Sequence, residues 1–155
     1  VVDAAERGLL VTLEDLNAIQ WLDKKSHSVA QAGYFPLDVY KKHNMAPSVI
    51  KFHQDSMINQ MDKSMPLFID QDAAKILEWV RAESLDGIII AEPPIGPTNT
   101  SLKSLVHSLE LAGIEFYRDR HWWDEILYPY ATQGFFRFKK AIPYAISRKN
   151  EFTKT

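Results

Sequence analysis

Acidic side chains follow two apolar runs of the chain, and paired carboxylates can do acid–base chemistry or hold a hydroxyl-bearing ligand. Glu14 and Asp15 come after the run at residues 9–13, and Glu92 comes after the run at 87–91. If the two runs are neighbouring parallel strands at which the sheet reverses its winding, these carboxylates face one crevice. Asp15 is also a suitable helix N-cap, and acidic residues stabilise helix starts. A structural role for these carboxylates is therefore favoured over a role in acid–base chemistry or ligand binding.

A Pro- and Gly-rich loop with a polar end follows Glu92, at the place where an α/β protein binds its ligand. Backbone N–H groups and hydroxyls that can hold a phosphate at a helix start are offered by Gly96, Thr98, Asn99 and Thr100. Three prolines remove backbone donors from the same loop: Pro93, Pro94 and Pro97. Helix capping explains the polar residues without a ligand, so capping is favoured. The glycine motifs of dinucleotide-binding and phosphate-binding loops are absent.

Metal and thiol chemistry find no support in the sequence. The five histidines are His27, His43, His53, His107 and His121. No two of them have the i, i+4 spacing of helical metal ligands, and no HExxH motif occurs. Cysteine is absent, which excludes disulfides, thiolate nucleophiles and cysteine-based metal sites and fits a reducing, intracellular compartment.

The bulk composition is that of a globular protein with one core. The chain has 155 residues, of which 46% are hydrophobic and 25% are charged. No apolar run approaches the roughly 20 residues that cross a bilayer. The net charge of −2 argues against direct nucleic-acid binding. A start at Val1 rather than Met indicates a trimmed chain, a processed organellar (plastid or mitochondrial) protein or a fragment.

The elements that must position these residues alternate between strand and helix patterns. Strands are expected at 9–13, 29–35, 66–69, 87–91 and 114–117. Helices are expected after a cap at Asp15, from Pro47 to about Asp62, after a cap at Asp70 or Asp72, and from a cap at Thr98, Asn99 or Thr100 to Gly113. This alternation predicts a Rossmann-like α/β fold, a doubly wound five-stranded parallel sheet with helices on both faces.

Periodicity predicts which helix residues face the core. The second helix is expected to bury Ile50, Met57, Ile58 and Met61. The third is expected to bury Ala73, Ile76, Leu77 and Val80. The clearest pattern belongs to the fourth, with Leu102, Leu105, Val106 and Leu109 at i, i+3, i+4, i+7.

After residue 117 the pattern changes, so we divide the chain into an α/β domain at 1–117 and an aromatic, then basic, extension at 118–155. Residues 118–143 have no clean period, and so aromatic a segment must pack on the domain or on a partner. Candidate partner contacts are Trp122, Trp123, Phe135, Phe136, Arg137, Lys139 and Lys140. Stacking on a flat chromophore is the less favoured role for the aromatic residues.

The chain resembles the N-terminal antenna (α/β) domain of the DNA photolyase/cryptochrome family. One similarity is the join of the second strand to a long helix, with GYFP at 33–36, Tyr40 and HNMAP at 43–47, where Ala46 replaces the family's capping Ser. A second is WDEILYP at 123–129 followed by GFFRFKKA at 134–141, which is similar to the sequence that closes the family's domain. The order and spacing of elements agree over almost the whole chain.

The departures from the family pattern concern its binding residues. The family's first strand carries Trp-Phe-Arg-x-Asp-Leu-Arg, whereas residues 11–17 read VTLEDLN. Antenna-binding members have an Asn/Tyr-rich segment where residues 92–96 read EPPIG. The chain also stops near the point where the family's linker to its FAD-binding helical domain begins. The resemblance therefore implies a degenerate pocket and no photorepair by these residues alone.

The expected function is that of a non-catalytic photolyase/cryptochrome-like domain, a binding or structural subunit of a larger assembly with a protein partner and no cofactor. One alternative is an antenna-chromophore module that holds a folate or a flavin such as FAD, with Glu92 and Asn99 as contacts. A further alternative is a small nucleotide-binding enzyme on the same fold.

Overall fold

The computed structural model describes residues 6–26, 28–70, 73–132 and 134–149. Contacts divide the chain into one compact unit that ends at Asp119 and a second that starts at Arg120. The first unit contains β1 (Arg7–Thr12), the short 3-10 helix η1 (Leu13–Asp15), α1 (Ala18–Ser26), β2 (Ala30–Phe35), α2 (Leu37–Lys42), α3 (Pro47–Gln60), β3 (Leu67–Ile69), α4 (Ala73–Ala82), β4 (Gly87–Ala91), α5 (Pro97–Leu111) and β5 (Glu115–Asp119). The second unit contains α6 (Trp122–Ala131) and α7 (Phe135–Ser147).

The five strands form one parallel sheet in the order β3-β2-β1-β4-β5. The chain winds outward from β1 through β2 to β3, then crosses back to β4 on the other side of β1 and continues to β5. This order confirms the predicted doubly wound sheet. It also places the reversal of winding between β1 and β4, where Gly8 pairs with Ile88.

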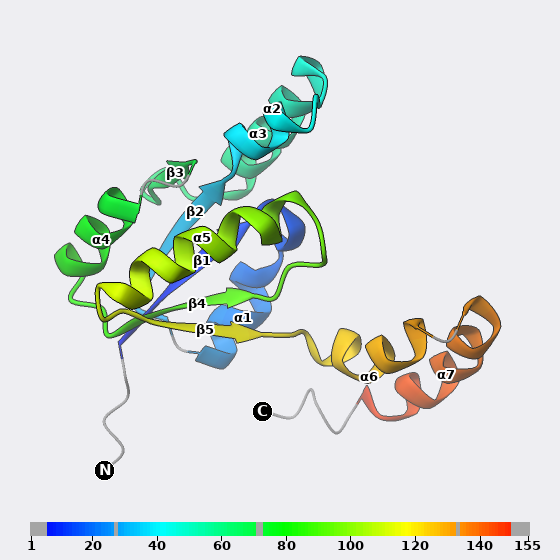
Figure 1. The fold of residues 1–155 in the computed structure, drawn as a ribbon. Helices are drawn as coiled ribbons and strands as arrows, with labels where there is room; N and C mark the ends of the chain where they lie inside the picture. Colours follow the sequence, from blue (N-terminus) through cyan, green and yellow to red (C-terminus); the bar gives the residue numbers. More distant parts are fainter. Residues whose placement is uncertain (1–5, 27, 71–72, 133, 150–155) are drawn as a thin grey trace, which may run out of the picture. The chain divides into compact units, whose positions relative to one another are not determined.

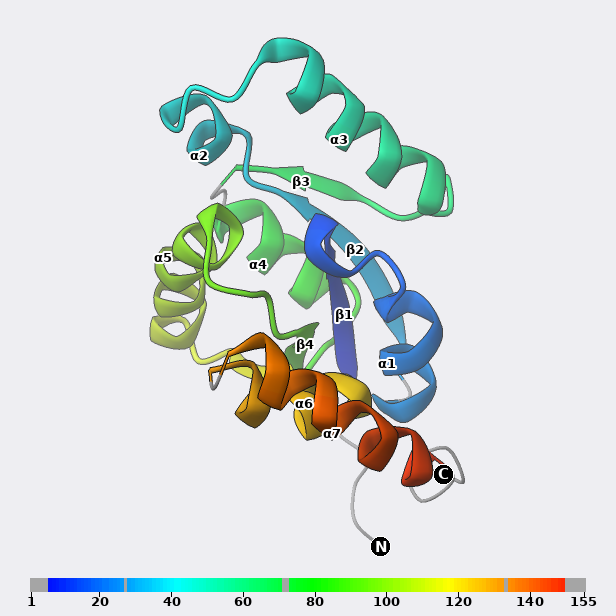
Figure 2. The ribbon, with the colours of Figure 1, turned by 90° about the vertical axis from the view of Figure 1, so that its right-hand side faces the viewer.

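Helices cover both faces of the sheet, as Figure 2 shows for α4 and α5 on one side of the strands and α1 and α3 on the other. Alternate residues of β1 point to opposite faces because the side chains of a strand alternate. Leu10 packs in the cluster that contains Leu102 and Leu105 of α5, whereas Leu9 packs with Leu22 of α1. The apolar stripe predicted for α5 is therefore the one that covers the sheet.

Several predicted details of the first unit are wrong. Leu13 begins η1 rather than ending β1, and α1 begins at Ala18 instead of directly after Asp15. Ile58 of α3 is 52% exposed, because Met57 occupies the core position and the next residue lies about 100° further round the helix. The N-cap of α4, predicted at Asp70 or Asp72, stays a prediction; Oδ1 of Asp70 accepts a hydrogen bond from the backbone N–H of Asp38, in α2, at 2.5 Å. Asp72 lies outside the described residues.

The second unit is a pair of helices that pack side by side (Figure 1). Leu127 of α6 lies against Ala141 and Ala145 of α7, with Phe138 and Ile142 packed around them. The inward residues of α7 thus have the i, i+3, i+4, i+7 spacing of a helix face. The sequence pattern did not reveal this helix face, because Pro129 and Pro143 lie inside the two helices and large apolar residues surround the two prolines.

Candidate functional site

The carboxyl ends of β1 and β4 and the start of α5 form the edge at which a doubly wound sheet binds ligands. Thr98 lies in the first turn of α5 and is fully buried. Its hydroxyl donates a hydrogen bond to Oε1 of Glu14 at 2.8 Å. The Tyr40 hydroxyl, on α2, lies 3.2 Å from Oγ1 of Thr98, and it is the donor there because the single proton of Thr98 points to Glu14. The three side chains are thus bonded to one another at this edge.

A second buried polar pair lies one turn further along α5. The hydroxyls of Tyr34, on β2, and Ser101 are 2.5 Å apart, and both residues are buried. Burial raises the pKa of Tyr34 to about 12, an effect that the Ser101 hydrogen bond partly opposes. Burial also raises the pKa of Tyr40. Both tyrosines are therefore neutral near pH 7 and act as hydrogen-bonding groups rather than as bases or nucleophiles.

The capping role predicted for Thr98, Asn99 and Thr100 is wrong. The N-cap of α5 is Gly96, and among the described residues no side chain makes the cap hydrogen bond. Pro97 takes the first helical position, where its missing N–H is not needed. Thr98 and Thr100 consequently lie inside the helix, and the Thr100 hydroxyl donates to the Gly96 carbonyl at 3.1 Å.

The other candidate contacts also lie near this edge. Glu92 is exposed, and its backbone N–H donates to the Asp119 carbonyl at 2.7 Å, which extends the pairing of β4 with β5. Oδ2 of Asp15 accepts from the indole N–H of Trp21 at 2.9 Å. Asn99 accepts from Nη1 of Arg118 at 3.5 Å. Gly96 has no atom within 4 Å of the place where a Cβ would stand.

The residues that organise the edge were missed by the sequence interpretation, apart from Glu14 and Thr98. Tyr40 was noted only for its family resemblance, and Tyr34 and Ser101 were not singled out. His53 of α3 lies with its ring 5.9 Å from the Tyr40 ring, and its buried Nδ1 has no hydrogen-bond partner among the described residues. A polar residue on the buried face of a helix pattern is the signal that could have identified Thr98 and Ser101. Thr98 lies four residues before the buried Leu102, and Ser101 lies next to it.

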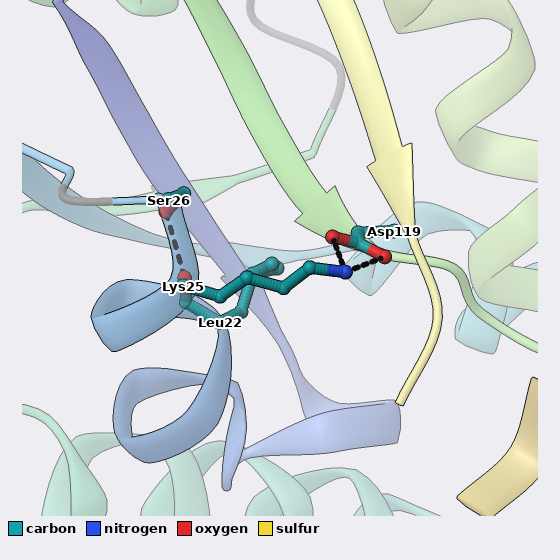
Figure 3. A network of polar contacts seen from close by, with 4 residues as sticks. All are labelled: Leu22, Lys25, Ser26 and Asp119. Atoms are coloured by element: carbon teal, nitrogen blue, oxygen red, sulfur yellow. Dashed lines mark hydrogen bonds and ion pairs between the residues drawn. The ribbon is translucent and has the colours of Figure 1, made fainter. Parts of the chain in front are cut away.

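An ion pair ties α1 to the last residue of β5 (Figure 3). Nζ of Lys25 lies 2.7 Å from Oδ2 of Asp119 and 3.0 Å from its Oδ1. The Lys25 side chain is 59% exposed and that of Asp119 is 25% exposed. Solvent screening limits such a pair to a small contribution to the stability of the unit.

The candidate partner contacts all lie in the second unit. Trp122 and Trp123 stand at the start of α6 with ring centroids 5.3 Å apart, and both are half-buried. Phe135 and Phe136 open α7 and are 70% and 78% exposed. The three basic candidates, Arg137, Lys139 and Lys140, follow them and are exposed.

A hollow of about 460 Å³ lies away from the candidate edge, between the end of α2 and the start of α3. Its polar lining includes Lys41 and Lys51, and Lys51 is paired with Asp55 at 2.6 Å. The described residues contain no cluster of His, Cys, Asp or Glu that is suited to a metal ion. None of the helices in the described segments is long and apolar enough to span a membrane.

Comparison of the chain with protein-family models, with curated protein sequences and with solved structures finds no match.

Proposed function

We propose that this chain is a non-catalytic, photolyase/cryptochrome-like α/β domain that serves as a binding or structural subunit of a larger assembly. The observation that carries the proposal is the chain of hydrogen bonds from Tyr40 through Thr98 to Glu14. These groups stand where a ligand of a doubly wound domain is recognised, yet they bond to one another. A ligand there would have to compete with bonds that are already formed, of which the one between Tyr40 and Thr98 is buried.

The loop after β4 supports the same proposal. Pro93, Pro94 and Pro97 carry no N–H groups, so few backbone donors are left for a phosphate or a carboxylate. Pro93 is also buried, which fixes the loop in place. The exposed aromatic and basic residues at the start of α7 then provide the surface for a protein partner.

The test is mass spectrometry of the full chain purified from its source, recording both copurifying proteins and small molecules. The proposal predicts a specific protein partner and a colourless preparation from which denaturation releases no pterin, flavin or nucleotide. Stoichiometric release of one of these compounds would overturn it.

The alternative of an antenna module rests on the exposed part of the same loop. Ile95 is 92% exposed and Glu92 is exposed, so both lie at the surface that a folate or a flavin would cover. A Glu92→Ala variant distinguishes the two proposals. It would lose the fluorescence of a bound pterin or flavin if the antenna role is correct, and it would change nothing if the domain binds no chromophore.

A further inference from the structure

The two helices of the second unit carry opposite charges on their exposed sides. The first turn of α6 holds the exposed Asp124 and Glu125, and the helix contains no basic residue. In α7 the charged residues are Arg137, Lys139 and Lys140, and none is acidic. A surface with both signs in separate places is complementary to a second copy of itself that is turned by a two-fold rotation.

Apolar side chains lie beside these charges. Phe136 is 78% exposed, and Lys139 and Lys140 follow it at i+3 and i+4, so the three share one side of α7. The inward side of α7 is occupied by other residues, Phe138, Ala141, Ile142 and Ala145. The Phe135 ring lies 5.6 Å from that of Phe136 and is 70% exposed. On α6, Tyr128 is 50% exposed.

The four charged side chains are available for a partner. Within the described part of the chain, Asp124, Glu125, Lys139 and Lys140 make no side-chain hydrogen bond or ion pair. They do not pair within the hairpin because α6 and α7 meet through Leu127 and the small residues of α7. Exposed charges of opposite sign beside exposed aromatic rings are typical of the rim and the centre of a protein interface.

We propose that the second unit binds the second unit of another copy of this chain, with Asp124 and Glu125 of one copy against Lys139 and Lys140 of the other. A two-fold axis makes this contact twice, and Phe136, on the same side of α7 as Lys139 and Lys140, is covered by it. The inference deepens the proposed structural role and rests on it. An anionic membrane or a nucleic acid is the less suitable occupant, because either would repel Asp124 and Glu125.

The test is sedimentation velocity of the full chain over a range of concentrations, with charge-reversed variants. The wild-type chain is expected to shift from monomer to dimer as its concentration rises, and added salt is expected to weaken the dimer. Lys139→Glu/Lys140→Glu and Asp124→Lys/Glu125→Lys are each expected to weaken self-association by on the order of tenfold or more, because like charges then face each other. An equimolar mixture of the two variants restores opposite charges and is expected to form a heterodimer.

The matched control is Lys41→Glu/Lys42→Glu, which reverses an adjacent, exposed lysine pair at the end of α2 and is expected to leave the dimer intact. Circular dichroism melting of every variant separates lost association from lost folding. A wild-type chain that stays monomeric, or a dimer that ignores both reversals, would overturn the inference. Either result leaves the proposed function standing, whereas a copurifying flavin, pterin or nucleotide overturns that function whether or not the chain dimerises.

Discussion

The hydroxyl of Thr98 bonds to the carboxylate of Glu14 across 84 positions of sequence, at 2.8 Å. This bond joins the start of α5 to the segment that follows β1, at the point where the winding of the sheet reverses. Doubly wound domains open a ligand crevice at that point. Here the same point is bridged by a part-buried contact between the buried Thr98 and the exposed Glu14, which the Tyr40 hydroxyl extends.

Replacing Thr98 with Val tests how much this contact contributes to the stability of the protein. The substitution keeps the shape of the side chain but leaves the Tyr40 hydroxyl without its acceptor in a buried place. We expect the free energy of unfolding in urea to fall by about 1 to 3 kcal/mol. Thr100→Val is the matched control, because Thr100 is exposed and bonds only to the backbone of its own helix. Equal effects of the two variants would contradict the assigned role of Thr98.

The raised pKa of Tyr34, about 12 against 10 for an ordinary tyrosine, makes the stability depend on alkaline pH. Below pH 10 the residue is protonated in both states, and its contribution is fully present. Above pH 10 the unfolded chain releases the proton first, so stability falls as the pH rises towards 12. The loss attributable to Tyr34 is about 2 to 3 kcal/mol.

Urea unfolding of the wild type and of Tyr34→Phe at pH 8, 10 and 11 measures this effect. The wild type is expected to lose more stability than the variant between pH 10 and pH 11, because phenylalanine does not ionise. Parallel pH curves for the two proteins would contradict the assignment. Tyr40 remains in both and cancels from the difference.

The parts of the fold that sequence patterns predicted are those with strong local signals. β4 was located at its observed bounds, because a run of Ile residues follows a turn at Asp86 and Gly87. The end of α5 was also correct, since Gly113 takes the positive φ of 84° that a helix terminus favours. In contrast, α2 has only six residues and follows Pro36 without a capping hydrogen bond from a side chain, so its pattern was too short to recognise.

The backbone of β5 lies so close to Gly87 that there is no room for a side chain at this position. A Cβ there would stand 2.8 Å from the carbonyl oxygen of Glu115 on the neighbouring strand, which is part of the sheet and cannot move aside. Gly87→Ala is therefore expected to destabilise the protein by about 1 to 3 kcal/mol. Gly96→Ala is the control, because nothing lies within 4 Å of its Cβ position. A chemical denaturation curve for Gly87→Ala that overlays that of Gly96→Ala would refute this explanation.

The ion pair of Lys25 with Asp119 is expected to add little to stability despite its short distances (Figure 3). A double-mutant cycle with Lys25→Met and Asp119→Asn is expected to give a coupling energy below about 1 kcal/mol, decreasing as salt is added. A larger coupling that persists in high salt would show that the pair is shielded from solvent and would contradict the exposure of Lys25.

The strand order around the candidate edge was predicted, but the bonding of its side chains was not. Sequence order and winding rules placed Glu14 and Glu92 at one edge of the sheet, since such rules depend only on strand order. The bond between Thr98 and Glu14 could not be foreseen, because a local signal made Thr98 a plausible cap and its true partner is distant in sequence. Side-chain pairing across a sheet edge depends on rotamers and helix placement that no sequence period encodes.

The most direct test of the central claim is the melting temperature of the full chain with and without FAD, FMN, a folate and ATP, each added in large excess. A ligand that binds only the folded state raises the melting temperature, and the rise grows with the logarithm of the ligand concentration above the dissociation constant. The bonds among Thr98, Glu14 and Tyr40 predict no concentration-dependent rise for any of the four compounds. A concentration-dependent rise that Glu92→Ala abolishes would contradict the claim and establish a working pocket at the edge between β1 and β4.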